Sequence, residues 1–230
     1  MDTDTNRSYK RHCYWKSLRT ENHAAKACLV EVLQYFINNV SKGRVTPDWD
    51  FFLTNRELIP KPGKKDYSSK NSWRPISVGT SENWIFEKIL LNRLSPYLTR
   101  KDCQFGYKEH HSTAHAIELV RTIERNHDAH ICLLDASSAF DKISWRRIRD
   151  QLINRQVPYL LIKILICQLY STKISVCGKS LFYPGLGVKE GGVLSGILFS
   201  DCYNDLASDL KKNRSRNIVQ KCNPFYFTLC

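Results

Sequence analysis

The sequence lacks any apolar run long enough to cross a membrane, and its first residues lack the apolar region of a secretory signal. The best candidate span, residues 159–169, is too short and contains Lys163, whereas a membrane helix needs about 20 apolar residues. The chain begins Met1-Asp2-Thr3-Asp4, and a signal peptide would instead place an apolar stretch near this end. These two absences predict an intracellular protein of the nucleus or cytoplasm that is not secreted.

Paired cysteines are also absent. The nine cysteines are dispersed, odd in number and never arranged as Cys-x-x-Cys, which disfavours both a disulfide framework and a zinc module. Free thiols in a reducing compartment are therefore expected. A zinc site built from Cys103, His110, His111 and His115 is disfavoured, because three histidines and a lone cysteine are a poor structural zinc set.

Acidic residues are few compared with basic ones. The chain carries 22 Asp and Glu against 35 Lys and Arg, giving a formal net charge of +13. Such a balance favours RNA or DNA as a partner, since neutralising phosphates releases counterions. A soluble basic protein, or one associated with ribosomes or membranes, would have the same balance. With 42% hydrophobic residues, the chain is expected to fold rather than to be disordered.

Hydrophobic periodicity predicts several helices and two hairpins. Helices are expected over residues 23–39, 81–98, 112–123, 144–152, 159–170 and 193–210. In the second of them, Ser81 is expected to cap the helix and Trp84 to lie in the core. Extended segments are expected at residues 51–59 and in an alternating hairpin at 173–183, with a basic turn at 61–66.

One stretch combines a strand pattern with a carboxylate. Residues 131–134 are apolar and read Ile-Cys-Leu-Leu, and Asp135 follows where the expected buried strand ends. A carboxylate in this position is commonly a helix N-cap or a turn residue. It also suits a magnesium ion, which often takes one or two protein carboxylates together with substrate phosphates. The stretch alone leaves both interpretations open.

Five motifs occur in a fixed order around this stretch. They are Leu-Ile-Pro-Lys-Pro-Gly-Lys at 58–64, Trp-Arg-Pro-Ile-Ser at 73–77, Gln-Phe-Gly-Tyr at 104–107 with His-Ser-Thr at 111–113, Asp-Ala-Ser-Ser-Ala-Phe-Asp at 135–141, and Gly-Gly-Val-Leu-Ser-Gly-Ile-Leu-Phe at 191–199. In this order they resemble the reverse transcriptase domain of non-LTR (LINE-type) retrotransposons. The resemblance extends from about residue 32 to residue 212.

The resemblance implies an α+β fold with the right-hand polymerase architecture, mostly helical with a small antiparallel sheet. It divides the chain into a polar basic leader at 1–23, fingers at 24–125, an incomplete palm at 126–212 and an unrelated tail at 213–230. It also implies an RNA-directed DNA polymerase, a nucleotidyltransferase that uses two magnesium ions, deoxynucleoside triphosphates, an RNA template and a DNA primer.

The resemblance also assigns site residues. Asp135 would be the catalytic residue and a metal ligand, with the Ala136 carbonyl as a second ligand. The nucleotide would contact Lys61, Arg74, Phe140, Glu190, Gly191 and Gly192, and the template–primer would contact Gly192 and Ser195. Phe140 would act as a gate that excludes ribonucleotides, because its ring would clash with a 2′-hydroxyl. Asp141 is expected to be a structural cap rather than a ligand.

Departures from the family pattern affect the expected activity. Glu190 stands where the family usually has glutamine, Gly196 where it has proline, and Asp201 where it has an apolar residue. The aromatic-x-Asp-Asp motif that completes the metal site does not occur in this sequence, and Asp201, Asp205 and Asp209 are expected to form a solvated helix stripe instead. The chain is therefore expected to be a truncated reverse transcriptase fragment, inactive alone; the alternative is a non-catalytic nucleic-acid-binding remnant or co-opted retroelement protein.

Overall fold

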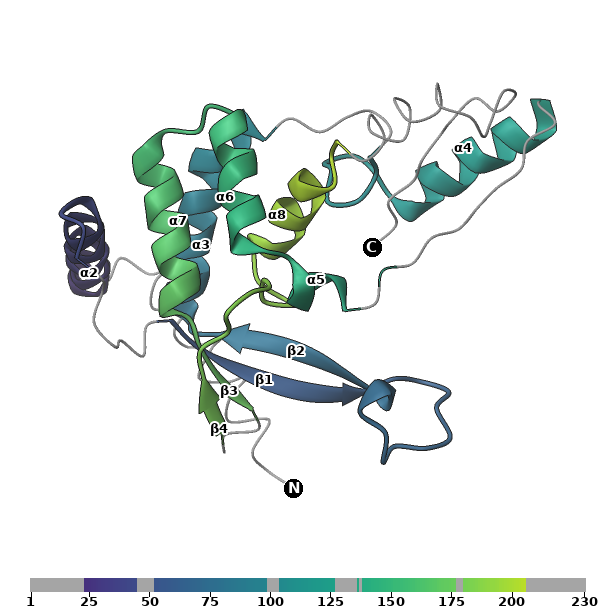
Figure 1. The fold of residues 1–230 in the computed structure, drawn as a ribbon, viewed down its shortest axis with the longest axis horizontal. Coiled ribbons are helices and arrows are strands. Elements are labelled where there is room, and N and C mark those ends of the chain that lie inside the picture. The colour runs from purple at the N-terminus through teal and green to yellow at the C-terminus, as the bar shows by residue number, and fades with distance from the viewer. Residues whose placement is uncertain are drawn as a thin grey trace.

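A computed structural model of the chain describes residues 23–44, 52–98, 104–126, 136, 138–176 and 180–205. A small sheet lies at one end of the molecule, helices α3, α6 and α7 stand beside one another above it, and α4 extends away from them (Figure 1). The predicted leader to residue 22, the Asp135 strand and the tail lie outside the described residues. The predicted combination of helices and one small sheet is confirmed.

The sheet joins two hairpins in the order β2-β1-β3-β4. Strands β1 (Leu53–Pro60) and β2 (Trp73–Gly79) are antiparallel, as are β3 (Lys173–Val176) and β4 (Ser180–Phe182), so both predicted hairpins are confirmed. Strands β1 and β3 are parallel, however, with Leu53 opposite Lys173. The expectation of a purely antiparallel sheet is therefore wrong, because a turn fixes the direction within each hairpin but not between hairpins.

The turn between β1 and β2 is held by contacts within itself. The Lys61 backbone N–H donates to the Ser72 carbonyl oxygen at 2.8 Å, and the Tyr67 hydroxyl donates to the Lys61 carbonyl oxygen at 3.0 Å. The Trp73 indole N–H donates to the Tyr67 carbonyl oxygen at 2.9 Å. Hydrogen bonds from the Ser68 hydroxyl and backbone N–H lower the pKa of the Asp66 carboxyl. The predicted basic hairpin tip is thus an ordered turn.

Most predicted helices occur close to the expected positions. They are α2 (His23–Ser41), α3 (Ser81–Leu94), α4 (Thr113–Asn126), α5 (Ala139–Lys142), α6 (Trp145–Asn154), α7 (Tyr159–Ser171) and α8 (Ser195–Cys202). Two ends differ from the expectation. Helix α3 changes to the 3-10 turn η3 (Ser95–Tyr97) because Pro96 has no N–H to continue the α-helical ladder. Helix α8 ends at Cys202, where the Asn204 N–H bonds to the Asp201 carbonyl oxygen at 3.1 Å and tightens the last turn.

Helix starts also follow local chemistry. The Thr80 hydroxyl, rather than that of Ser81, accepts the Asn83 N–H at 3.2 Å and caps α3. The Ser112 hydroxyl accepts the His115 N–H at 3.4 Å, so the predicted cap of α4 is confirmed. Helix α2 is followed by Gly43 at φ +75°, a conformation that glycine adopts without steric cost.

The core is built around three phenylalanines from different elements. Phe36 of α2, Phe52 before β1 and Phe86 of α3 meet edge to face with ring centroids 5.2 to 5.6 Å apart. Helix α7 packs against α2, α3 and α6, so it connects this cluster to the rest of the core. Trp84 is not part of it: its side chain is 42% exposed with the Lys88 ammonium 5.3 Å from the ring, and its predicted core position is wrong.

Asp201 also differs from its predicted environment. Its side chain is 4% exposed and lies 3.1 Å from the Arg155 guanidinium, so a solvated position for it is wrong. Arg155 directly follows α6, and α6 packs against α8. This ion pair therefore links the ends of two helices.

Two thiols occur among the residues whose surroundings are described. Cys167 and Cys202 are both free, and burial raises the pKa of each, that of Cys202 to about 12. At neutral pH neither is a thiolate, so both behave as small packing groups rather than nucleophiles. No helix within the described ranges has the length and apolar character that a membrane span requires.

Candidate functional site

A glycine-containing loop, residues 185–194, lies against the free edge of β2. The Ser77 backbone N–H donates to the Glu190 carbonyl oxygen at 2.7 Å. Gly191 has φ +99°, and a Cβ on it would lie 3.0 Å from the Ser77 carbonyl oxygen. Glycine is therefore required both for the conformation and for the close approach. The docked loop also covers backbone groups at the edge of β2 that would otherwise be unpaired.

This contact brings two predicted nucleotide-binding residues together. Arg74 lies on β2, extended before Pro75 as expected, and its Nε atom is 4.0 Å from a Glu190 carboxylate oxygen. The side chains are 61% and 34% exposed, so both groups face solvent. A guanidinium in this position can bond two phosphate oxygens at once, but Glu190 offsets part of its charge.

Residues 187 and 188 of the loop form hydrogen bonds with α5 and with the residues that follow it. The Val188 N–H donates to the Phe140 carbonyl oxygen and the Gly187 N–H to the Ile143 carbonyl oxygen, each at 2.8 Å. The Trp145 indole N–H donates to the Gly187 carbonyl oxygen at 2.6 Å. The segment that follows Asp135 in the sequence and the glycine loop are thus one structural unit.

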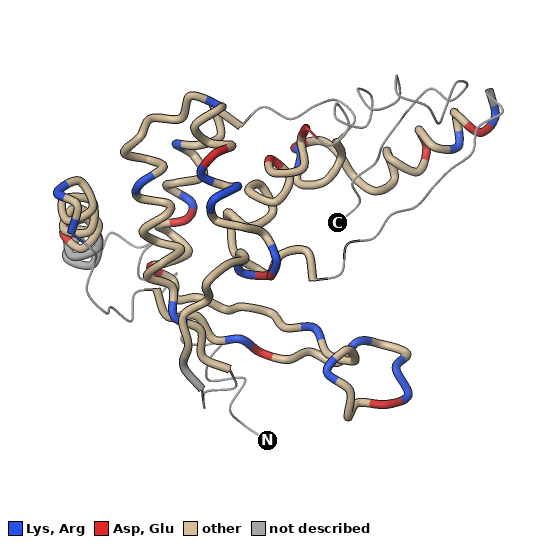
Figure 2. Tube along the Cα trace, in the orientation of Figure 1, with Lys and Arg blue, Asp and Glu red and all other residues tan. Residues whose placement is uncertain are grey.

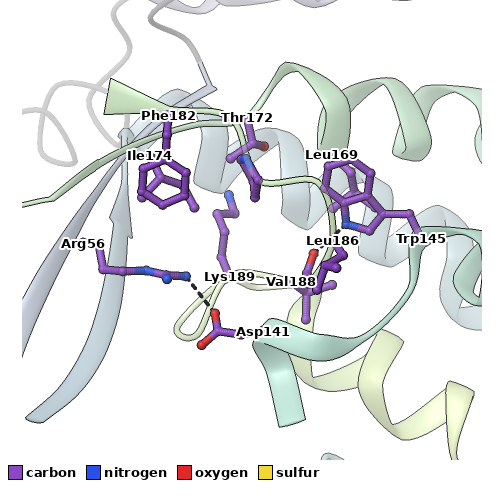
Figure 3. Close-up of a pocket in the computed structure, with 12 residues that line it drawn as sticks. Arg56, Asp141, Trp145, Leu169, Thr172, Ile174, Phe182, Leu186, Val188 and Lys189 are labelled. Carbon is purple, nitrogen blue, oxygen red and sulfur yellow. Dashed lines mark hydrogen bonds and ion pairs between the residues drawn. The ribbon is translucent and has the colours of Figure 1, made fainter. Parts of the chain in front are cut away.

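Asp141 connects this unit to the sheet. Its carboxylate lies 3.0 Å from the Arg56 guanidinium of β1 (Figure 3). The residue at the N-cap of α5 is Ser138. Asp141 is therefore an ion-pair partner and not the predicted cap. The pair borders a pocket of about 240 Å³ whose walls are mainly apolar and include Trp145 and Ile174. Arg56 was absent from the predicted site, because nothing in its local sequence indicates a partner on α5.

Phe140 is half-buried and stacks on Phe199 of α8 with ring centroids 4.9 Å apart. The Tyr107 ring lies 6.4 Å from it on an edge-to-face approach. These contacts fit a packing role, and its role as a ribonucleotide gate stays a prediction. Ala136 is exposed, and Asp135 lies outside the described residues, so the predicted metal ligands are untested.

The remaining predicted site residues have structural contacts of their own. The Lys61 ammonium donates to the Asn71 carbonyl oxygen at 3.1 Å, which leaves two of its three N–H donors for a phosphate. Ser195 is buried, and a Cβ on Gly192 would lie 2.6 Å from its hydroxyl oxygen. Contacts of Gly192 and Ser195 with a template–primer stay predictions.

The 104–107 loop is docked onto α8. The buried Gln104 side-chain amide donates to the Ser200 carbonyl oxygen at 2.7 Å. The Tyr107 ring lies directly over the Gly196 backbone, where a Cβ would overlap it. The absence of the family's proline at position 196 thus coincides with close packing of an aromatic ring.

The Gly196→Ala variant is expected to lose about 1–3 kcal/mol of stability, because the added methyl group overpacks a close contact. The measurement is the free energy of unfolding in urea, followed by tryptophan fluorescence. The matched control is Gly185→Ala, since a Cβ on Gly185 meets no atom within 4 Å. Equal free energies for the two variants would show that the Tyr107 ring moves aside without cost.

The described residues alone do not form a metal centre. They contain no group of three His, Cys, Asp or Glu side chains able to hold an ion. The carboxylates of Asp141 and Glu190 both face guanidinium groups. The His111 and His115 rings are 6.3 Å apart, and Cys103 lies outside the described residues, so the zinc interpretation is untested.

Comparison with known proteins gives a family match. The family model for reverse transcriptase (RNA-dependent DNA polymerase) matches residues 59–223, which continues past residue 212, where the motif resemblance is expected to end. The chain is similar to a probable RNA-directed DNA polymerase from transposon BS of Drosophila melanogaster, with 26% identity over 162 residues. It is also similar to the RNA-directed DNA polymerase from mobile element jockey of the same organism, with 31% identity over 166 residues. Each alignment covers 65% of this chain and 18% of the relative.

Proposed function

Since the chain belongs to the reverse transcriptase (RNA-dependent DNA polymerase) family, we propose that it forms the nucleotide-facing part of such a polymerase. The resemblance to non-LTR retrotransposons is confirmed by the family match and by relatives from mobile elements. The observation that carries the proposal is the 2.7 Å hydrogen bond between Ser77 and Glu190, which sets Arg74 beside the Gly191–Gly192 loop. A triphosphate would lie along this junction, with its phosphates on Arg74.

The hairpin tip extends the positive charge of this site. Lysines 61, 64, 65 and 70 lie on or beside the turn, at the far end of β1 and β2 (Figure 2). The Tyr67 and Trp73 rings pack edge to face 5.7 Å apart at its base and hold the turn in shape. A shaped basic turn suits phosphates of a nucleotide or of a template–primer. We assign these as the partners of the hairpin, with Lys61 directed at the nucleotide.

The family's chemistry adds a metal requirement. Magnesium, when bound, stabilises the attacking and leaving oxygens of nucleotidyl transfer. We propose that Asp135 and the Ala136 carbonyl are the residues of this chain that would hold it. Because the aromatic-x-Asp-Asp sequence does not occur in the 230 residues, we expect the chain alone to bind its ligands without extending a primer.

A non-catalytic nucleic-acid-binding protein is the second candidate, and the basic turn between β1 and β2 is the observation that favours it. Binding of a labelled deoxynucleoside triphosphate separates the two functions. Triphosphate binding would identify the nucleotide-facing part of a polymerase, whereas salt-dependent binding of RNA or DNA without triphosphate binding would identify a binding protein.

The Arg74→Ala variant tests the proposed site directly. It is expected to weaken deoxynucleoside triphosphate binding by about 10- to 100-fold, because hydrogen bonds to a charged group are lost. The measurement is a fluorescence titration of the full 230-residue chain with a labelled triphosphate. Arg93→Ala is the control, since Arg93 is an exposed arginine in the last turn of α3. Equal affinities for both variants would contradict the assignment.

A further inference from the structure

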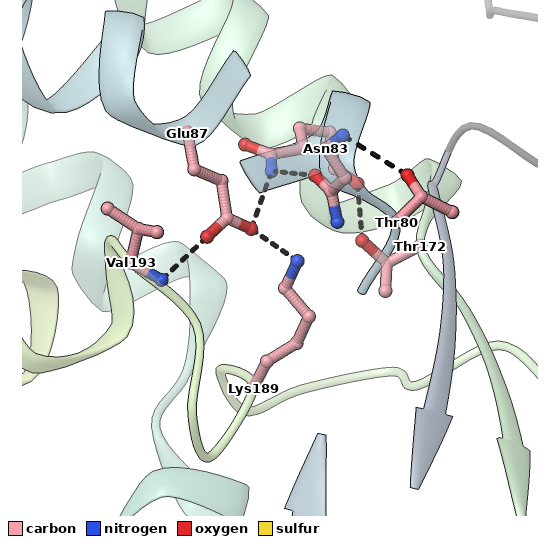
Figure 4. Close-up of polar contacts among 7 residues, drawn as sticks. Thr80, Asn83, Glu87, Thr172, Lys189 and Val193 are labelled. Atoms are coloured by element: carbon pink, nitrogen blue, oxygen red, sulfur yellow. Dashed lines mark hydrogen bonds and ion pairs between the residues drawn. The ribbon is translucent and has the colours of Figure 1, made fainter. Parts of the chain in front are cut away.

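Helix α3 carries a buried carboxylate that none of the family motifs includes. Glu87 is 3% exposed, although its neighbours Phe86 and Leu90 form part of the apolar core. Its two oxygens are held by three groups: the Lys189 ammonium, the Val193 backbone N–H at 2.7 Å and the Gln168 side-chain amide at 3.0 Å (Figure 4). With these partners, the buried carboxylate has both of its oxygens hydrogen-bonded or ion-paired.

Two of these partners belong to the glycine loop. Lys189 precedes Glu190, Gly191 and Gly192, and Val193 follows them. Glu87 therefore holds the segment on both sides of the glycine pair. Ser77 of β2 also holds Glu190 through the 2.7 Å hydrogen bond. The part of the loop around the glycine pair is thus held by a strand edge and by a single carboxylate.

The carboxylate is itself held in place. The Gln168 amide that donates to Glu87 also donates to the Asn83 side-chain oxygen at 3.2 Å. The Thr172 hydroxyl donates to the Gln168 backbone carbonyl oxygen at 2.9 Å, so this bond satisfies the end of α7 and does not hold the Gln168 side chain. Asn83, Gln168 and Thr172 are each at most 3% exposed. Because the network is buried and its members constrain one another, the Glu87 side chain has little freedom to change rotamer.

We infer that Glu87 is the positioning residue of the nucleotide loop: it sets where the Gly191–Gly192 backbone lies relative to Arg74. This inference rests on the proposed function for the role of the loop, but the contacts themselves do not. Glu87 touches no nucleotide and acts through Lys189 and Val193. Its loss would leave the Lys189 ammonium buried without its carboxylate, and the loop would shift to hydrate it.

The test follows hydrogen exchange of backbone N–H groups in the full chain without any ligand. In Glu87→Ala the Val193 N–H is expected to exchange about 10- to 100-fold faster, as for the loss of one hydrogen bond to a charged acceptor. The N–H groups in the middle of α7 are expected to change less than about threefold. Glu87→Gln retains an oxygen acceptor, so it is expected to restore much of the Val193 protection. Glu82→Gln, on the first turn of the same helix, is the control.

A second readout is the affinity for a labelled triphosphate, expected to fall about tenfold in Glu87→Ala and less in Glu87→Gln. If Val193 exchanges no faster than the α7 groups, Glu87 is merely a core residue and the inference is overturned. If Glu87→Ala does not fold, Lys189→Met is measured instead. Faster exchange at the Val193 N–H then supports the inference, and unchanged exchange overturns it. A wild-type chain that binds no triphosphate would refute the proposed function and leave the exchange result standing.

Discussion

Replacing Asp201 with leucine is expected to lower the free energy of unfolding by about 3 kcal/mol, because it removes the carboxylate from a mostly buried guanidinium. The Arg155 side chain is 19% exposed and that of Asp201 4%, so solvent replaces the lost partner only in part. The measurement is urea unfolding followed by tryptophan fluorescence. The double variant Arg155→Met/Asp201→Leu is expected to recover most of the loss, since it removes both charges and keeps apolar volume.

The exposed pair of Arg146 and Asp150 provides the matched control. These residues are four apart on α6, with side chains 83% and 49% exposed and 3.8 Å between the charged atoms. Arg146→Met is therefore expected to cost less than about 1 kcal/mol. A double variant as unstable as Asp201→Leu alone would mean that packing, rather than an unpaired charge, causes the loss.

Asp201 also shows what spacing can and cannot predict. The four-residue spacing of Asp201 and Asp205 predicts one helical stripe, but α8 ends at Cys202 and Asp205 lies in the turn after it. Spacing also cannot say which way Asp201 faces, and its partner Arg155 is distant in the sequence. The departure from the family's apolar residue at 201 was visible in the sequence. Only the fold shows that a guanidinium compensates for it.

Local elements were predictable because their signals are local. The hydrophobic periods of α2, α6 and α7 gave their positions, and Gly178-Lys179 between alternating segments indicated the β3–β4 hairpin. The parallel pairing of β1 with β3 has no local signal, since these strands are far apart in the sequence. The sheet also combines strands from both sides of residue 125, so the fingers and palm boundaries stay predictions.

The site residues that belong to sequence motifs could be predicted, and those outside the motifs were not. Arg74, Glu190 and Gly191 were identified separately, and the structure places them together. Arg56 and Glu87 were missed. Glu87 had a usable signal, because a carboxylate within the apolar stripe of α3 requires a buried partner. Arg56 had none, because its partner Asp141 depends on how β1 meets α5.

The second large effect is expected at Glu190, where the family's glutamine can be restored. Glu190→Gln is expected to tighten triphosphate binding by about tenfold at low salt, because a unit charge about 4 Å from another contributes roughly 1 kcal/mol even in water. A triphosphate carries several negative charges, and the Glu190 carboxylate lies 4.0 Å from the Arg74 guanidinium that we propose binds them. The measurement is the labelled-triphosphate titration of the full chain at two salt concentrations.

The salt dependence identifies the cause of such a gain. Screening shortens the range of a charge from about 10 Å at 0.1 M salt to about 3 Å at 1 M, so the advantage of Glu190→Gln should largely disappear at high salt. Glu118→Gln, on the exposed surface of α4, removes one negative charge away from the site and should leave the affinity unchanged. If Glu190→Gln instead weakens binding, the carboxylate serves to orient Arg74, and its attraction for the guanidinium outweighs its repulsion of the phosphates.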